Sequence, residues 1–177
     1  MQNRFNKSIK LVGSVLLACI VFTGFLYLND DIGIRGSQLE SDIRSSQAIK
    51  EDWVVDGTAS DTMAAFISYP RELGAHTFSV YVNRPGLSFG WFFRGGGGLA
   101  GVDTGIAEIT VNGYNEHAFI SMNKQQVERL EVDKGSSIQV IDIDSSKPFS
   151  IVLPVNAGGI AFYDVDGKRV ECCECPL

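Results

Sequence analysis

The pattern of apolar and polar positions divides this chain into an N-terminal apolar segment, a polar connection and a β-patterned remainder. Residues 11–28 contain no charged side chain, and residues 29–50 are polar with scattered Ile and Leu. From Trp53 onward, short runs of Val, Ile, Phe, Tyr and Thr alternate with Gly, Asn, Asp and Pro. This spacing is typical of an all-β domain. The sequence therefore predicts a mainly β domain, a β-sandwich or open barrel, over residues 51–171.

The apolar segment has the length of a membrane-spanning helix. Its 18 residues approach the ~20 that a helix needs to cross a hydrocarbon core. The basic side chains precede it and acidic ones follow, namely Arg4, Lys7 and Lys10 before, and Asp30 and Asp31 after. By the positive-inside rule, we expect a single-pass protein of the cell membrane. Residues 1–10 would be cytoplasmic, 11–28 the anchor, 29–50 a solvated stalk, and the β domain extracytoplasmic.

Two other interpretations of the N-terminus remain open. A cleaved signal peptide also has a basic start, but its apolar region is usually shorter. Leu16-Leu17-Ala18-Cys19 resembles a lipoprotein signal, which would make Cys19 a lipidation site. However, nine residues after Cys19 are uncharged, whereas a lipid-modified cysteine normally begins a polar tether. All three interpretations place the β domain on the same side of the membrane.

Within the β domain, turn residues and periodicity predict most of the elements. Asp166-Gly167 predicts a two-residue hairpin, and residues 112–115 predict a second turn. Asn123 is a candidate N-cap for one short helix through Val127 and Leu130, ending near Gly135. In the stalk, Leu39 and Ile43 have helical spacing, so a short helix is an alternative there. The predicted strands cover residues 52–56, 62–69, 76–83, 87–94, 106–112, 116–122, 137–143, 149–153, 159–164 and 168–171.

The net charge argues against nucleic acid as a partner. The whole chain carries −6, and subtracting the +3 of the first ten residues leaves −9 for the remainder. A domain this acidic lacks the basic surface that nucleic acids and anionic lipids require. The sequence also predicts no cofactor.

A glycine-rich stretch after an aromatic strand is the main candidate for a binding surface. Gly96, Gly98 and Gly101 match a GxGxxG pattern, but the dinucleotide fold needs a helix next, and the following residues have a β pattern. We therefore expect a surface loop whose glycines permit close approach of a ligand or partner. Strand alternation places Phe89, Trp91 and Phe93 on one face of the strand and Phe92 on the other. The row of three aromatic side chains is either the inward face of the core or a binding platform. The candidate binding residues are Arg84, Trp91, Phe93, Arg94, Gly95, Gly96, Gly97 and Gly98.

Three cysteines crowd the tail at residues 172–177, within the sequence ECCECPL of residues 171–177. Outside the cytoplasm, thiols such as Cys172, Cys173 and Cys175 tend to oxidise. A Cys172–Cys175 bridge is the easier local loop, which leaves one thiol for an intermolecular bond. An inert tail and a soft-metal site for Cu(I) or Zn are the alternatives.

Motifs for catalysis are incomplete. Asp103-Thr104-Gly105 resembles the active-site triplet of retroviral-type aspartic proteases, whose chemistry needs two carboxylates sharing one proton. Ile106 stands where that family prefers a small residue. His76 and His117 lie in β segments without a neighbouring nucleophile motif. Asp142 and Asp144 begin an oxygen-rich stretch that lacks the glycine and glutamate of a calcium loop.

The sequence thus predicts a membrane-tethered, non-enzymatic module that binds a protein or cell-envelope partner through residues 84–105. A ligand, soft-metal or redox sensor built on the terminal cysteines is one alternative. An aspartic-type hydrolase is another.

Overall fold

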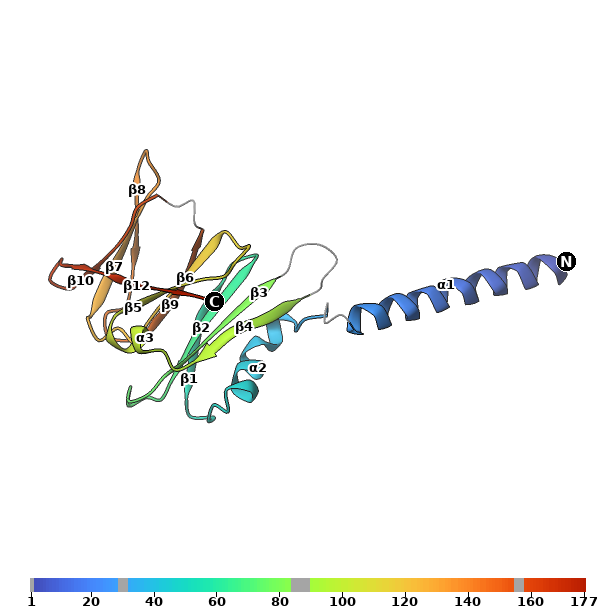
Figure 1. Ribbon diagram of the computed structural model, residues 1–177, viewed down its shortest axis with the longest axis horizontal. Coiled ribbons are helices and arrows are strands. Elements are labelled where there is room, and N and C mark those ends of the chain that lie inside the picture. The colour runs from blue at the N-terminus through green and yellow to red at the C-terminus, as the bar shows by residue number, and fades with distance from the viewer. Residues whose placement is uncertain (1, 29–31, 84–89, 155–157) are drawn as a thin grey trace.

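The computed structural model describes residues 2–28, 32–83, 90–154 and 158–177 (Figure 1). The first helix, α1 (Gln2–Leu28), projects away from the β domain, and its side chains are described from residue 12. Within the described residues, no helix combines the length and apolarity of a membrane span. The remaining helices are short: η1 (Gly36–Gln38), α2 (Leu39–Ser46) and α3 (Ala100–Thr104).

The strands form three four-stranded sheets. The helix-side sheet has the order β1 (Val54–Ala59), β2 (Met63–Tyr69), β3 (Thr77–Asn83), β4 (Trp91–Gly97). The central sheet has the order β12 (Cys172–Pro176), β5 (Ile106–Thr110), β6 (Glu116–Ser121), β9 (Phe149–Pro154). The distal sheet has the order β11 (Arg169–Val170), β10 (Ile160–Asp164), β7 (Val127–Asp133), β8 (Ile138–Asp142). The β12–β5 pair is parallel, and the other strand pairs are antiparallel.

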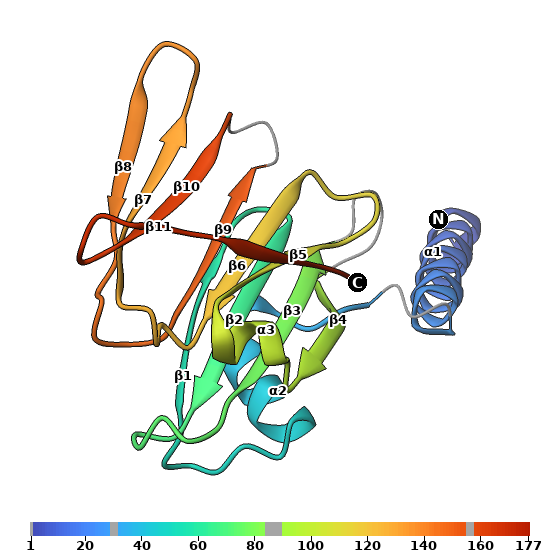
Figure 2. The ribbon, with the colours of Figure 1, turned by 60° about the vertical axis from the view of Figure 1, so that its left-hand side comes forward.

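The sheets stack in layers because the central sheet is apolar on both faces. Ala107, Ile109 and Ile120 pack against the helix-side sheet in one core. Ile106 and Phe119 point the other way and pack against the distal sheet in a second core. Successive side chains along each strand point to opposite faces of the sheet. A short apolar run therefore contributes side chains to both cores. Figure 2 shows the resulting order, with the central strands between the other two sheets. The predicted mainly β class is confirmed, with three layers of sheet.

Helix α2 covers the outer face of the helix-side sheet. Leu39 and Ile43, at helical spacing, are buried against Ala64 and Tyr81. Residues 39–46 were expected to belong to a solvated stalk; that expectation is wrong for them, and the alternative of a short helix is confirmed. Their apolar stripe packs on the sheet because burying it removes about 1.5–3 kcal/mol of unfavourable hydration per large side chain.

The short helix predicted after Asn123 is instead strand β7. Asn123 has a positive φ of 54°, and its side chain bonds both the N–H and the C=O of Val127. It therefore closes a loop and does not cap a helix. Leu130 and Val132 point into the distal core, while Arg129 and Glu131, on either side of Leu130, point outward. This period of two is the strand signal that the helical interpretation overlooked.

Both predicted hairpins are present, with one adjustment. The turn at residues 112–115 joins β5 to β6, and Gly113 has a positive φ of 85°. The β10–β11 hairpin has three loop residues, because the N–H of Asp164 donates to the C=O of Lys168. Gly167, with φ 75°, takes the left-handed position in that loop. Residues 172–176, expected to be a tail, form β12.

Ile43→Ala tests whether α2 belongs to the folded domain. Ile43 is fully buried, so we expect its truncation to lower the free energy of unfolding by about 2–5 kcal/mol. The matched control is Ile32→Ala, at a position that is 45% exposed, where we expect a change below about 0.5 kcal/mol. Urea unfolding of the full-length chain, followed by tryptophan fluorescence, measures both. Equal small effects would mean that α2 contributes nothing to the domain.

Candidate functional site

Strand β4, which contains most of the predicted binding residues, is an edge strand. It pairs with β3 on one side. On its other side, Ile34 and Trp91 exchange two backbone hydrogen bonds of 2.9 and 2.8 Å in an antiparallel bridge. Within the described residues, no other strand pairs with β4. Its free edge therefore runs from Phe93 to Gly97, and we call this stretch the β4 edge.

The glycines at residues 95–97 belong to this strand, so the expected surface loop is wrong for them. A Cβ on Gly95 would lie 2.8 Å from the side chain of Leu177. One on Gly96 would lie 2.5 Å from Nε2 of Gln47 and 2.7 Å from the carbonyl oxygen of Phe78. The C-terminus and the end of α2 thus pack directly onto the backbone of β4. Gly98 follows the strand, and open space surrounds it.

The aromatic residues of β4 separate as strand alternation predicts. Phe92 is buried in the core between the helix-side and central sheets. Trp91 and Phe93 lie on the opposite face, where Trp91 packs with α2 and Ile34. Phe93 is 45% exposed, and its ring meets that of Tyr81 edge-on with centroids 5.5 Å apart. Trp91 is therefore mostly a packing residue, whereas Phe93 remains available to a partner.

A polar contact fixes the aromatic cluster beneath Phe93. The hydroxyl of the fully buried Tyr81 donates to Oδ2 of Asp42 on α2 at 2.7 Å. Burial and the bond to Asp42 both raise the pKa of Tyr81, so the phenol stays protonated. The pair ties α2 to the sheet directly behind the β4 edge.

The two candidate arginines are not equally placed. Arg94 is exposed at a bulge in β4, between the pairs Phe93–Tyr81 and Gly95–Val80. It has no partner residue on β3, so its backbone is free of that ladder. Arg84 and Phe89 lie outside the described residues.

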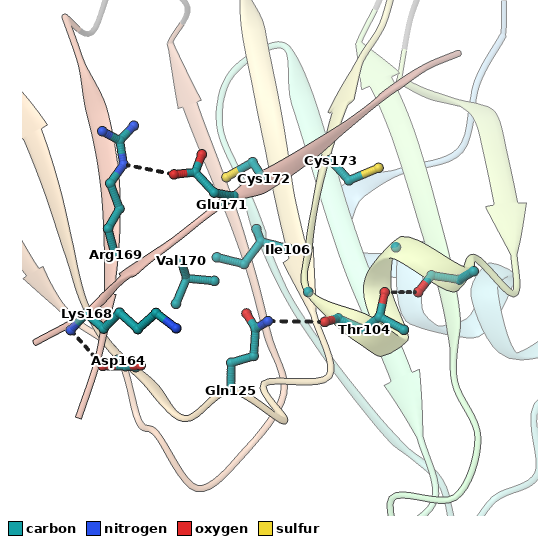
Figure 3. Close-up of a pocket in the computed structure, with 13 residues that line it drawn as sticks. Thr104, Ile106, Gln125, Asp164, Lys168, Arg169, Val170, Glu171, Cys172 and Cys173 are labelled. Atoms are coloured by element: carbon teal, nitrogen blue, oxygen red, sulfur yellow. Dashed lines mark hydrogen bonds and ion pairs between the residues drawn. The ribbon is translucent and has the colours of Figure 1, made fainter. Parts of the chain in front are cut away.

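The four cysteines, all among the described residues, are free thiols. Cys19 is exposed on α1, which continues to Leu28. Cys172 packs toward the distal core and Cys175 toward the core on the other side of the central sheet. Figure 3 shows the side chains of Cys172 and Cys173 leaving β12 in different directions. A local Cys172–Cys175 bridge therefore requires β12 to unfold, because its partners lie on opposite faces.

A cavity of about 820 Å³ lies between α3, the β10–β11 hairpin and the start of β12 (Figure 3). Several of the polar side chains that line this cavity interact with other residues of its lining. The ε nitrogen of Arg169 lies 3.7 Å from Glu171, and Gln125 donates to the carbonyl of Thr104 at 3.3 Å. Two acidic and two basic side chains line it without a preferred sign of charge. This arrangement offers space but no convergent set of catalytic groups.

The motifs considered for catalysis or calcium have ordinary structural partners. Asp103 lies near the end of α3 and pairs with Lys124 at 2.7 Å; this bond lowers the pKa of its carboxyl group. An ionised carboxylate paired with lysine does not suit the shared proton of an aspartic protease dyad. Nε2 of His76 contacts both backbone polar groups of Leu99, at 3.1 and 3.2 Å. Asp144 accepts bonds from Ser146 in a local turn.

A polar pair that the sequence patterns did not predict lies between the central and distal sheets. Nδ1 of His117 lies 2.5 Å from Oε1 of Glu108, and both side chains are about three-quarters buried. The signal was available, because the hairpin turn places these residues diagonally on one face of β5 and β6. Glu108 also lines a small cavity of about 200 Å³ with Glu171 and Glu174. Even so, the described part of the chain contains no group of three or more His, Cys, Asp or Glu side chains arranged to hold a metal ion.

Comparison with known proteins gives no relative: no protein-family model, no curated protein and no solved structure matches this chain.

The three thiols of β12 should differ in reactivity. Burial, with contributions from the charges of Glu108 and Glu171, raises the pKa of Cys172 from 9.0 to about 12. Because the thiolate is the nucleophile, this shift lowers its reactive fraction near neutral pH about a thousandfold. Mass-spectrometric timing of iodoacetamide labelling at about pH 8 should therefore show the exposed Cys173 modified first and Cys172 last, at least about a hundredfold slower.

The control is the same labelling in denaturant, where the three rates should converge. Early modification of Cys172 in the folded chain would contradict its burial against the distal core.

Proposed function

We propose that the chain is a membrane-tethered β module that binds an extended peptide segment of a cell-envelope protein along the β4 edge. The observation that carries this proposal is the bridge between Ile34 and Trp91. There the chain's own extended segment already pairs with the outer side of β4. A partner segment that continues the line would pair with Phe93–Gly97, as in recognition by strand addition.

The side chains along the β4 edge support this mode of binding. Gly96 is exposed, and no described strand pairs with Gly95–Gly97 on the outer side of β4, although Leu177 and Gln47 pack against Gly95 and Gly96. Because glycine has no side chain, this edge offers little steric hindrance to an incoming strand. Phe93 provides exposed apolar surface next to the buried Tyr81 ring. Main-chain bonds would supply affinity, and an apolar partner side chain against Phe93 would supply selectivity.

The anchor is the second part of the proposal. The uncharged run at residues 11–28 corresponds to about 27 Å of helix, close to the ~30 Å hydrocarbon core. Its apolar side chains are largely exposed, including Val15, Leu17 and Val21 at 57–64%. A soluble protein rarely exposes so much contiguous apolar surface. In Figures 1 and 2, α1 lies on the side of the domain that carries α2 and β4, so the anchor would hold the β4 edge near the membrane.

Membrane integration can be measured by extraction. We expect the full-length chain to remain in the membrane pellet after alkaline carbonate treatment, and a chain lacking residues 11–28 to be released. Exchanging Arg4, Lys7 and Lys10 for glutamate should reduce the fraction of β domain that reaches the protease-accessible side. Release of the intact chain by carbonate would contradict an integral anchor.

The β4 edge is tested by crosslinking in the native membrane. A photoreactive benzoylphenylalanine at position 93 should capture a discrete partner, identified by mass spectrometry. Arg94→Pro removes one backbone N–H at the bulge without removing a pair with β3, and should reduce capture about tenfold or more. Arg94→Ala removes the same guanidinium group but keeps the N–H, and should leave capture unchanged.

Two controls complete this experiment. Circular dichroism must show equal folding for both Arg94 variants, and the photoreactive residue at the exposed Val140 of β8 should not capture the same partner. Equal loss of capture with Arg94→Ala would indicate recognition of an anionic group by the side chain and contradict strand addition. Absence of any partner at position 93 would contradict the proposal as a whole.

A further inference from the structure

Strand β12 presents two of its thiols on one face. Cys173 and Cys175 are two residues apart and pair in register with Ala107 and Ile109 of β5, whose side chains face the helix-side sheet. Side chains at positions i and i+2 of a strand point the same way, so both thiols face that side. Cys172 faces the distal core instead. The tail therefore contains a pair of thiols and a separate single thiol.

The two thiols of this pair are neighbours on that face of β12. Sγ of Cys175 is 3.6 Å from the carbonyl oxygen of Cys173. Cys173 is exposed, and its Sγ is 3.7 Å from the position of a Cβ on Gly101. Cys173 is thus accessible from solvent beside α3, whereas Cys175 is partly buried.

Strand geometry disfavours a disulfide between these two residues. A strand rises about 3.3 Å per residue, so the α carbons of residues 173 and 175 lie roughly 6.6 Å apart. Their β carbons, which stand nearly perpendicular to the sheet, are separated by a similar distance, whereas a disulfide requires about 3.5–4.5 Å. An ion held between the two sulfurs spans a longer gap than an S–S bond. β12 can therefore keep its pairing with β5 while both sulfurs bind one metal ion.

The donor set selects the ion. Soft thiolate ligands favour Cu(I), Zn or iron–sulfur clusters. A structural zinc site needs four ligands, and the described residues contain no cluster of three or more suitable side chains. Cu(I) is satisfied by two thiolates in a linear arrangement. Gly101 lies beside Cys173, and Ala107 is the register partner of Cys173 on β5.

We propose that Cys173 and Cys175 form a two-coordinate Cu(I) site. Binding converts two thiols to thiolates, forms two Cu–S bonds and releases two protons to solvent, so the oxidation state of copper and sulfur does not change. The site lies on β12 and does not involve Phe93–Gly97. It is therefore independent of the proposed partner binding at the β4 edge.

Copper titration of the reduced full-length protein tests this site. Under anaerobic conditions, Cu(I) is added in competition with the chelator bathocuproine disulfonate. We expect one equivalent to bind the wild-type chain, and X-ray absorption to show two sulfur ligands without nitrogen or oxygen. Cys173→Ser and Cys175→Ser should each weaken binding at least tenfold, because a hydroxyl is a poor ligand for a soft ion.

Cys172→Ser is the matched control, because this residue is the immediate neighbour in sequence but lies on the other face of β12. It should bind Cu(I) as the wild type does. The assignment would be overturned if Cys172→Ser weakened Cu(I) binding as much as the other two substitutions do. It would also be overturned by nitrogen or oxygen ligands in the coordination shell of copper, or by a wild-type chain that binds no Cu(I). If Cys175→Ser unfolds because that side chain packs against the core, the exposed Cys173→Ser decides the outcome, with near-ultraviolet circular dichroism confirming its fold.

Discussion

The central sheet is buried on both faces, and this constraint organises the rest of the molecule. Strands β5 and β6 must present apolar side chains in both directions, as Ile106, Ala107, Phe119 and Ile120 do. Each face then needs its own cover, which the helix-side and distal sheets supply. A polar residue on such a strand is costly unless it is paired, and Glu108 is paired with His117. The layered arrangement follows from this double burial more than from any single contact.

The same constraint explains why the last residues belong to the domain. One edge of the central sheet would be open beside β5 without β12, which pairs with β5 in parallel. This pairing brings Leu177 next to Gly95 and assigns each cysteine to a face of the sheet. The residue after β12, Leu177, contacts β4, and the proposed copper site lies on β12 itself.

Most strands were predictable because each needs only local information. Alternation between inward apolar and outward polar side chains is visible within a few residues, and Gly113 and Gly167 mark turns by their need for positive φ. The failure at β7 is instructive. Val127 and Leu130 are three residues apart, which fits a helix as well as a bulged strand, and Asn123 suits either a helix cap or a loop. Only the partner strand β10, from much later in the chain, resolves the ambiguity.

The sequence by itself determined the mainly β class, the positions of the hairpins and the opposite facing of Phe92 and Phe93, because these depend on the period of two in a strand. It also determined the acidic charge and the uncharged run at residues 11–28. The tertiary structure alone decided that α2 packs on the sheet and that Gly95 and Gly96 are strand residues under Leu177 and Gln47. It alone separated Cys172 from the other two thiols. These features depend on contacts between residues far apart in the chain, and local patterns do not encode which distant segment will cover a given face.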